Sequence, residues 1–126
     1  MMRTGTPEDH VRDYYDRNTM KFLQLSRWKS SKAIHQPLYT DPDMSLDEAL
    51  HTTHRRILSL LPSSQDLFHV VDLGCGVGAS MQFLAQHTTP NFCFHGITLS
   101  RLQVDRGRYS AFLSCCAYAV ARFTRT

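Results

Sequence analysis

The sequence predicts an α/β protein: the beginning of a doubly wound fold, in which strands and helices alternate along the chain. Two short apolar runs, residues 67–73 and 92–99, are bounded by turn residues and have the length of strands. The first is expected to be a strand buried on both faces of a parallel sheet. A glycine-rich turn at residues 74–78 joins this strand directly to a helical segment, which is typical of such folds.

The N-terminal region is expected to be helical. Pro7, followed by two acidic residues, predicts a helix start. Apolar side chains then recur at roughly helical spacing through residues 10–28. Asn18 and Thr19 weaken the pattern in its middle, so the sequence predicts two short helices there.

Three further helices follow from local signals. Ser45 and Glu48 have the spacing of a capping box, so a helix should begin there and end before Pro62. Residues 80–87 form the helix after the glycine-rich turn. Ser100 can cap another helix after the second strand.

The composition excludes several classes of protein. The 126 residues allow one domain, and 42% hydrophobic with 20% charged residues is ordinary for a globular protein. A net charge of +3 from scattered basic residues does not favour nucleic-acid binding. The longest apolar stretch, residues 111–120, is too short to span a bilayer, and the N-terminus has no secretory signal.

The cysteines indicate a reducing compartment. Their spacing contains no Cys-x-x-Cys pair and no zinc pattern, so no metal site is expected. We therefore expect free thiols and a cytoplasmic location for a chain with Cys75, Cys93, Cys115 and Cys116.

The turn after the first strand reads Asp-x-Gly-x-Gly-x-Gly, which predicts a cofactor loop. Gly74 would leave the strand in a tight turn, with a positive φ. Gly76 would remove a side chain so that a ligand can approach the backbone, and Gly78 would let the next helix pack closely on the strand. Asp72 would accept hydrogen bonds from the loop and face a cationic group of the ligand.

Other interpretations of the loop are less favoured. A dinucleotide site has Gly-x-Gly-x-x-Gly and an acid about 20 residues later, but residues 95–100 at the end of the second strand contain no acid. A phosphate-binding loop would continue with Gly-Lys-Ser or Gly-Lys-Thr. A structural turn without a ligand remains the simplest alternative.

Residues 71–78 resemble motif I of the class I S-adenosylmethionine-dependent methyltransferases. The segment Gly96-Ile97-Thr98-Leu99-Ser100-x-x-Gln103 resembles the branch with cyclopropane-fatty-acid synthases and tocopherol and sterol-type C-methyltransferases. The resemblance implies S-adenosyl-L-methionine as cofactor, with residues 98, 99 and 103 along its adenosine part. The expected cofactor-binding residues are Asp72, Gly74, Cys75, Gly76, Gly78, Thr98, Leu99 and Gln103.

The resemblance also implies a helical lid at the N-terminus. Tyr14 and Tyr15 resemble the aromatic start of that lid, although burial in a helix core is the commoner role of such residues. Trp28 is interpreted as a packing residue. His35 is the one candidate for a general base, and the catalytic residue is otherwise unknown. His51 and His54 are expected on the outer surface of their helix.

These inferences give a Rossmann-like class I methyltransferase fold that is truncated after the second strand. We expect a lid in residues 1–62 and the start of the cofactor domain in residues 63–108. Residues 109–126 are expected to be an atypical apolar tail or a continuation of the helix that begins at Ser100. The exposed sheet edge would favour association with another chain. The predicted function is methyl transfer to a small lipophilic or isoprenoid-like acceptor; the alternative is a fragment that binds the cofactor without catalysis.

Overall fold

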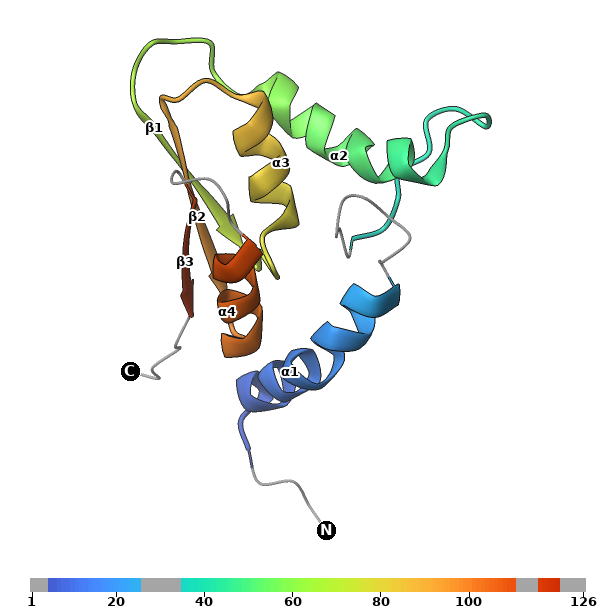
Figure 1. The fold of residues 1–126 in the computed structure, drawn as a ribbon, viewed down its shortest axis with the longest axis vertical. Coiled ribbons are helices and arrows are strands. Elements are labelled where there is room, and N and C mark those ends of the chain that lie inside the picture. Colours follow the sequence, from blue (N-terminus) through green and yellow to red (C-terminus); the bar gives the residue numbers. More distant parts are fainter. Residues whose placement is uncertain (1–4, 26–34, 111–115, 121–126) are drawn as a thin grey trace.

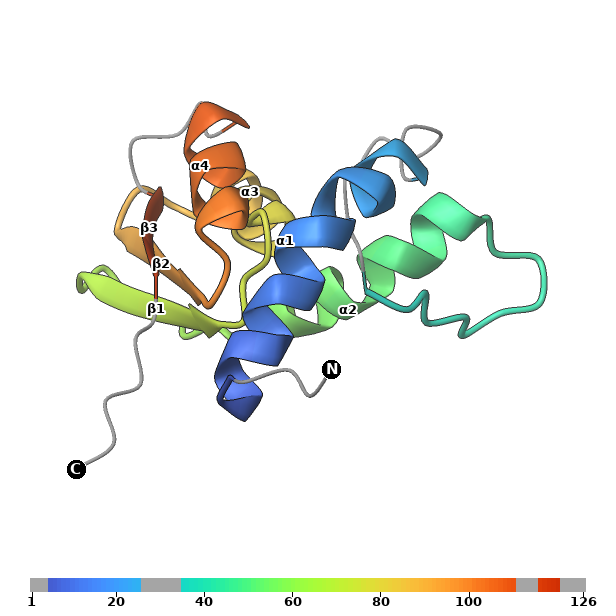
Figure 2. The ribbon, with the colours of Figure 1, turned by 90° about the horizontal axis from the view of Figure 1, so that it is seen from below.

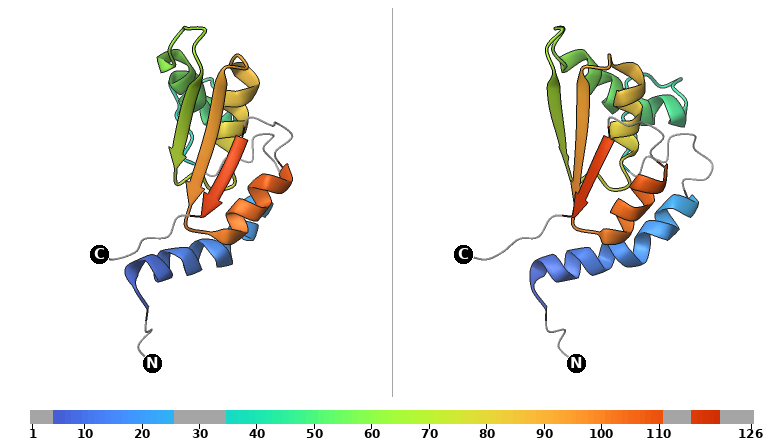
Figure 3. Two further views of the ribbon diagram at one scale, coloured as in Figure 1. Left: turned by 90° about the vertical axis from the view of Figure 1, so that its left-hand side faces the viewer. Right: turned by 60° about the vertical axis from the view of Figure 1, so that its left-hand side comes forward.

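The computed structural model describes residues 5–25, 35–110 and 116–120, and it confirms the α/β fold. Three parallel strands pair in the order β1-β2-β3. Figures 1 and 3 show the helices of the described residues together on one side of this sheet. The elements are α1 (Pro7–Leu25), α2 (Leu46–Leu60), β1 (Phe68–Leu73), α3 (Ala79–His87), β2 (Phe92–Thr98), α4 (Arg101–Ser110) and β3 (Cys116–Val120).

The third strand corrects one expectation. Residues Cys116–Val120 neither continue the preceding helix nor follow the sheet as a tail, and they pair in parallel with β2 from Phe94 to Thr98. The expected end of the sheet after the second strand is therefore wrong. The apolar residues of this segment suit a strand equally well, because a short apolar run does not distinguish a buried helix from a buried strand.

The first two strands differ in burial. Alternate residues of β2 are fully buried on the side of the helices. In β1 the alternate residues are exposed, including Val71 at 54% and Leu73 at 78%. The prediction that this strand is buried on both faces is wrong for the described residues. Figure 2 shows the reason: the helices cover one face, and β1 lies at the edge of the sheet.

Helix α1 is continuous rather than broken in two. Asn18 Nδ2 donates to the carbonyl of Tyr14 at 2.7 Å, and Thr19 Oγ1 donates to the carbonyl of Tyr15 at 2.6 Å. Both side chains thus bond one turn back instead of ending the helix. Thr19 is also fully buried, so tertiary packing supports the weak segment.

Helix α2 begins with the predicted capping box. Ser45 N donates to Glu48 Oε2 at 2.9 Å, and Glu48 N donates to Ser45 Oγ at 3.3 Å. The helix packs on α3, and its Ile57 and Leu58 border the core under the sheet. The centre of that core is formed by Met81, Leu84, Phe92, Phe94 and Val104. In the described part of the chain, no helix has both the length and the apolar character needed to cross a membrane.

Candidate functional site

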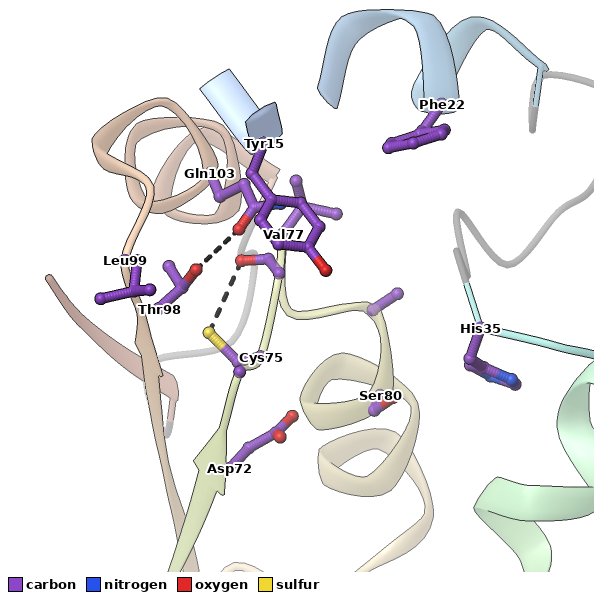
Figure 4. Close-up of a pocket in the computed structure, with 13 residues that line it drawn as sticks. Tyr15, Phe22, His35, Asp72, Cys75, Val77, Ser80, Thr98, Leu99 and Gln103 are labelled. Carbon is purple, nitrogen blue, oxygen red and sulfur yellow. Dashed lines mark hydrogen bonds between the residues drawn. The ribbon is translucent and has the colours of Figure 1, made fainter. Parts of the chain in front are cut away.

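A pocket of about 400 Å³ lies where β1 and β2 end and α3 and α4 begin. In open α/β sheets, ligands bind outside the carboxyl ends of the strands. Helix α1 provides part of the wall opposite the strands (Figure 4). The lining residues are Tyr15, Phe22, His35, Asp72, Gly74, Cys75, Gly76, Val77, Ala79, Ser80, Thr98, Leu99 and Gln103.

The glycine loop is shaped by positive φ angles, which are 82° at Gly74, 57° at Gly76 and 80° at Gly78. Only glycine adopts such angles without strain. The loop is fixed to β2, because the backbone N–H groups of Gly74 and Cys75 both donate to the carbonyl of Ile97, at 2.7 and 3.1 Å. The tight turn predicted at the first glycine is confirmed.

The space beside the loop is open. A Cβ atom built at Gly74 or Gly76 would meet no atom within 4 Å. The two glycines are therefore not required by packing within the described residues. They leave the backbone accessible from the pocket, which is the property that close approach of a ligand needs.

A closely packed glycine beside the loop is Gly96 of β2. A Cβ at Gly96 would lie 2.5 Å from Met81 Cε and 2.7 Å from Cys75 Sγ. Gly78 is the N-cap residue of α3 and is not among the residues that line the pocket. Its φ of 80° is in the left-handed region, which accounts for a glycine at this position. Sequence reasoning missed the role of Gly96, although this residue stands in the middle of the second strand, where a glycine indicates a close approach.

Asp72 is placed opposite Gly96 in the register of the sheet and lines the pocket. The loop hydrogen bonds expected for its carboxylate are absent among the described residues, so its oxygens remain available to a ligand. Burial raises the pKa of this carboxyl group. Burial, followed by the nearby Asp72, raises the pKa of the Cys75 thiol to about 12, so Cys75 is a neutral thiol and not a nucleophile.

The end of β2 is tied to α1 by buried side chains. Thr98 Oγ1 donates to Gln103 Oε1 at 2.6 Å, and Gln103 Nε2 donates to Thr19 Oγ1 at 3.2 Å. Ser100 Oγ donates to a carboxylate oxygen of Asp16. Both amide atoms of Gln103 therefore have protein partners, and this residue fixes α1 over the pocket. Sequence reasoning did not find this connection, because the partners lie 84 residues apart.

The two aromatic residues expected in a helix core are instead exposed. Tyr14 is 54% exposed and Tyr15 is 40% exposed, so burial in a core is wrong for both. Tyr15 and Phe22 extend from α1 and line the pocket, and Figure 4 shows both rings on the α1 side of the pocket. Trp28 lies outside the described residues.

A group of histidines forms the opposite wall. His35 lines the pocket, and its Nε2 lies 3.2 Å from His54 Nε2. His54 Nε2 also lies 2.9 Å from Ser80 Oγ, and His51 Nδ1 lies 3.2 Å from His54 Nδ1. His54 is 1% exposed, so the outer-surface position expected for it is wrong.

The charge state of this wall follows from burial. Burial, then the neighbouring His35, His51 and Arg55, lowers the pKa of His54 to about 4. His54 is therefore neutral near pH 7. In the described part of the chain, no three His, Cys, Asp or Glu side chains are arranged to hold a metal ion.

No family model matches the chain. Among solved structures, the cyclase SpnF matches with a TM-score of 0.75 and 19% identity over 94% of this chain and 43% of that one. A cyclopropane synthase of Mycobacterium tuberculosis matches with a TM-score of 0.68 and 22% identity, over 95% of this chain and 41% of that one. The chain has the class I methyltransferase fold.

Other comparisons agree with this fold. The geranyl diphosphate C-methyltransferase of Streptomyces coelicolor A3(2) matches with a TM-score of 0.67 and 20% identity, over 95% of this chain and 50% of that one. A curated relative, the sarcosine/dimethylglycine N-methyltransferase of Aphanothece halophytica, is 26% identical over 108 residues. That match covers 86% of this chain and 38% of the relative, so the chain spans about two fifths of the relative's length.

Proposed function

We propose that the pocket binds S-adenosyl-L-methionine and that the chain takes part in methyl transfer to a small lipophilic or isoprenoid-like acceptor. The observation that carries this proposal is the open glycine backbone at the end of β1, which faces a cavity of about 400 Å³. When bound, the cofactor supplies a methyl group on a positively charged sulfur. The loop, the carboxylate and the cavity fit a ligand that is elongated, partly apolar and cationic.

Each expected residue receives a role in this proposal. The backbone of Gly74 and Gly76 would lie against the cofactor, and the uncompensated carboxylate of Asp72 would face its amino group. Thr98 and Leu99 line the pocket and would lie along the adenosine part of the cofactor. The remaining expected residues act through shape: Cys75 by filling the space over β2, Gly78 by starting α3, and Gln103 by holding α1 in place.

The chain's contribution to the reaction would be positioning. The sulfonium charge is lost as the methyl group leaves, so a dry pocket that aligns donor and acceptor favours transfer. The segment of residues 1–62 would exclude water as a lid, with Tyr15 and Phe22 over the pocket. The acceptor class is suggested by the geranyl diphosphate and cyclopropane enzymes among the structural matches. Free thiols agree with a reaction in the cytoplasm.

A second candidate function is cofactor binding without methyl transfer. The chain spans only 38% of the curated relative, and the same fold is found in a protein that is named as a cyclase. The fold therefore serves more than one reaction. The exposed side chains of Val71 and Leu73 on edge strand β1 support a related proposal, that a further protein segment or chain covers this edge.

Two measurements separate these proposals. Calorimetric titration with S-adenosylhomocysteine and, in parallel, with NAD tests the cofactor: binding of the first alone supports the proposal, and preference for NAD contradicts it. Transfer of a radiolabelled methyl group from S-adenosylmethionine to geranyl diphosphate or sarcosine tests turnover. Cofactor binding with no transfer to either acceptor favours the second candidate.

A further inference from the structure

A continuous row of polar side chains leads from the pocket toward solvent. Ser80 of α3 lines the pocket, and its hydroxyl oxygen lies 2.9 Å from Nε2 of the buried His54. The other ring nitrogen of His54 lies 3.2 Å from Nδ1 of His51, which is partly exposed on α2. The positioning role proposed above for the pocket uses none of these contacts.

The contact of His35 with a carbonyl group determines the direction of the hydrogen bonds. His35 Nδ1 lies 3.0 Å from the carbonyl oxygen of Gln36, which can only accept, so Nδ1 carries a proton. In neutral His35, Nε2 is then unprotonated, and it faces Nε2 of His54 at 3.2 Å. His35 therefore favours the form of His54 that carries its proton on Nε2.

Two hydrogen-bond arrangements connect Ser80, His54 and His51 at the same positions of the atoms. In the first, Ser80 donates to His54 Nε2, His54 Nδ1–H donates to His51, and the contact between His54 Nε2 and His35 Nε2 contains no hydrogen bond. In the second, His54 Nε2–H donates to Ser80 and His35, while His51 Nδ1–H donates to His54. Changing from the first arrangement to the second moves one proton along the row, away from the pocket.

We propose that Ser80 is the proton acceptor for an amine or hydroxyl nucleophile in the pocket, and that His54 and His51 pass the proton to solvent. This inference rests on the proposed methyl transfer. The lone pair of the nucleophile forms the new bond to the methyl carbon, and the C–S bond breaks with its electron pair going to sulfur. The nucleophile's proton goes to Ser80 Oγ, the proton of Ser80 goes to His54 Nε2, and the Nδ1 proton of His54 goes to His51.

The charged and buried groups around these side chains favour transfer of the proton through His54 rather than a stable positive charge on its ring. His54 is buried and faces His35, His51 and Arg55, so a positive charge on its ring is unfavourable and its pKa is about 4. It can receive a proton on one nitrogen while releasing one from the other. For His51, burial lowers the pKa, Asp47 opposes this shift, and Arg55, His35 and His87 add to it. His51 therefore releases the proton to water near pH 7.

Variants at Ser80 test the first step. With S-adenosylmethionine and sarcosine as probes, Ser80→Ala should lower kcat about 100-fold with little change in KM, the size expected for loss of an acid–base group. Ser80→Thr keeps the hydroxyl and should restore most of the rate. His87→Asn, on the same helix but outside the row, should retain the full rate. Equal rates in the wild type and Ser80→Ala would overturn the proposal.

Nuclear magnetic resonance of the ring nitrogens gives a readout that needs no turnover. In the free wild-type chain, His54 should stay neutral between about pH 5 and 8 and exchange between its two proton positions. In Ser80→Ala, the proton should reside on Nε2 alone, held by His35. A single, unchanged proton position in both proteins would show a purely structural contact and refute the relay.

The two proposals fail in different ways. Absence of S-adenosylhomocysteine binding in calorimetry contradicts the proposed function, whatever the ring nitrogens show. Binding and methyl transfer that do not depend on the Ser80 hydroxyl contradict the relay alone. Where the chain binds the cofactor but does not turn over sarcosine, the proton positions of His54 decide the inference.

Discussion

The two walls of the pocket are built in different ways. The glycine wall comes from one short run of sequence after β1, with three positive φ angles and open space beside two of its glycines. The histidine wall is assembled from separate segments: His35 and His54 are 19 positions apart in the sequence, and His54 and Ser80 are 26 positions apart. The first is a local backbone property, whereas the second exists only after α2 and α3 have packed together.

The largest expected effect breaks the glycine wall. Gly76→Val should abolish measurable binding of S-adenosylhomocysteine, because a branched side chain would occupy the open space and disfavour the φ of 57°. Calorimetry measures the affinity, and circular dichroism checks the fold. Gly5→Ala is a matched control, since its Cβ would make ordinary contacts of 3.5 Å outside the pocket. Unchanged affinity in Gly76→Val would refute the assignment of the loop.

The next effect concerns the histidine wall and pH. His54 has a pKa of about 4 in the folded chain and 6.5 in its ordinary environment. Below pH 6.5 the unfolded chain binds a proton that the folded chain does not, so stability falls as the pH decreases from 6.5 to 4. The loss should reach about 3 kcal/mol, from 1.36 kcal/mol for each pH unit. Above pH 6.5 the contribution is absent.

Urea unfolding at several pH values measures this loss. The wild type and His87→Asn should both show it, because His87 is exposed and its ring lies within hydrogen-bond distance of the carbonyl of Phe83 in its own helix. His54→Phe should remove the His54 component and give a flatter profile. Identical pH profiles for the wild type and His54→Phe would show that burial does not suppress protonation of His54.

A smaller effect concerns Gly96 of β2, which packs beside the glycine wall and affects folding rather than binding. Gly96→Ala should destabilise the chain by about 1–3 kcal/mol, the usual cost of overpacking, because its Cβ would clash with Met81 and Cys75. The Met81 side chain can move, but Cys75 Cβ at 3.0 Å is close to the backbone and cannot. Urea unfolding measures the change. Stability equal to the wild type would show that the packing at Gly96 is looser than described.

The smallest effect concerns the attachment of α1. Thr19→Val keeps the shape of the side chain but leaves Gln103 Nε2 without its partner, which should cost about 1 kcal/mol. Hydrogen exchange should show less protection in α1 and unchanged protection in β2. Thr52→Val on α2 is the control, because its hydroxyl bonds within its own helix and to Met44. Equal protection of α1 in the wild type and Thr19→Val would argue against this role for Gln103.

Sequence reasoning found what depends on local backbone rules. The capping box at Ser45, the first two strands and the φ of Gly74 follow from residue type and spacing. It failed where tertiary packing determines the structure. Helix α1 continues through Thr19 because that residue is buried. One face of β1 is exposed because no described element covers it.

The same limit applies to the site. The residues that line the pocket at the strand ends were predicted from their motif, whereas the buried position of His54 was not. A histidine on a helix carries no sequence signal that distinguishes an exposed ring from one hydrogen bonded to Ser80. The third strand was missed for a related reason, because its five residues lie beyond the recognisable motifs.

The central claim is that the open glycine loop is a site for S-adenosylmethionine. The most direct measurement is a titration of the isotope-labelled chain with S-adenosylhomocysteine, followed through its backbone amide resonances. We predict saturable shifts that are largest at Gly74, Gly76 and Leu99 and small in the exposed strand residues Val71 and Leu73. Saturation without shifts in the loop, or the same shifts with NAD at equal concentration, would contradict the account.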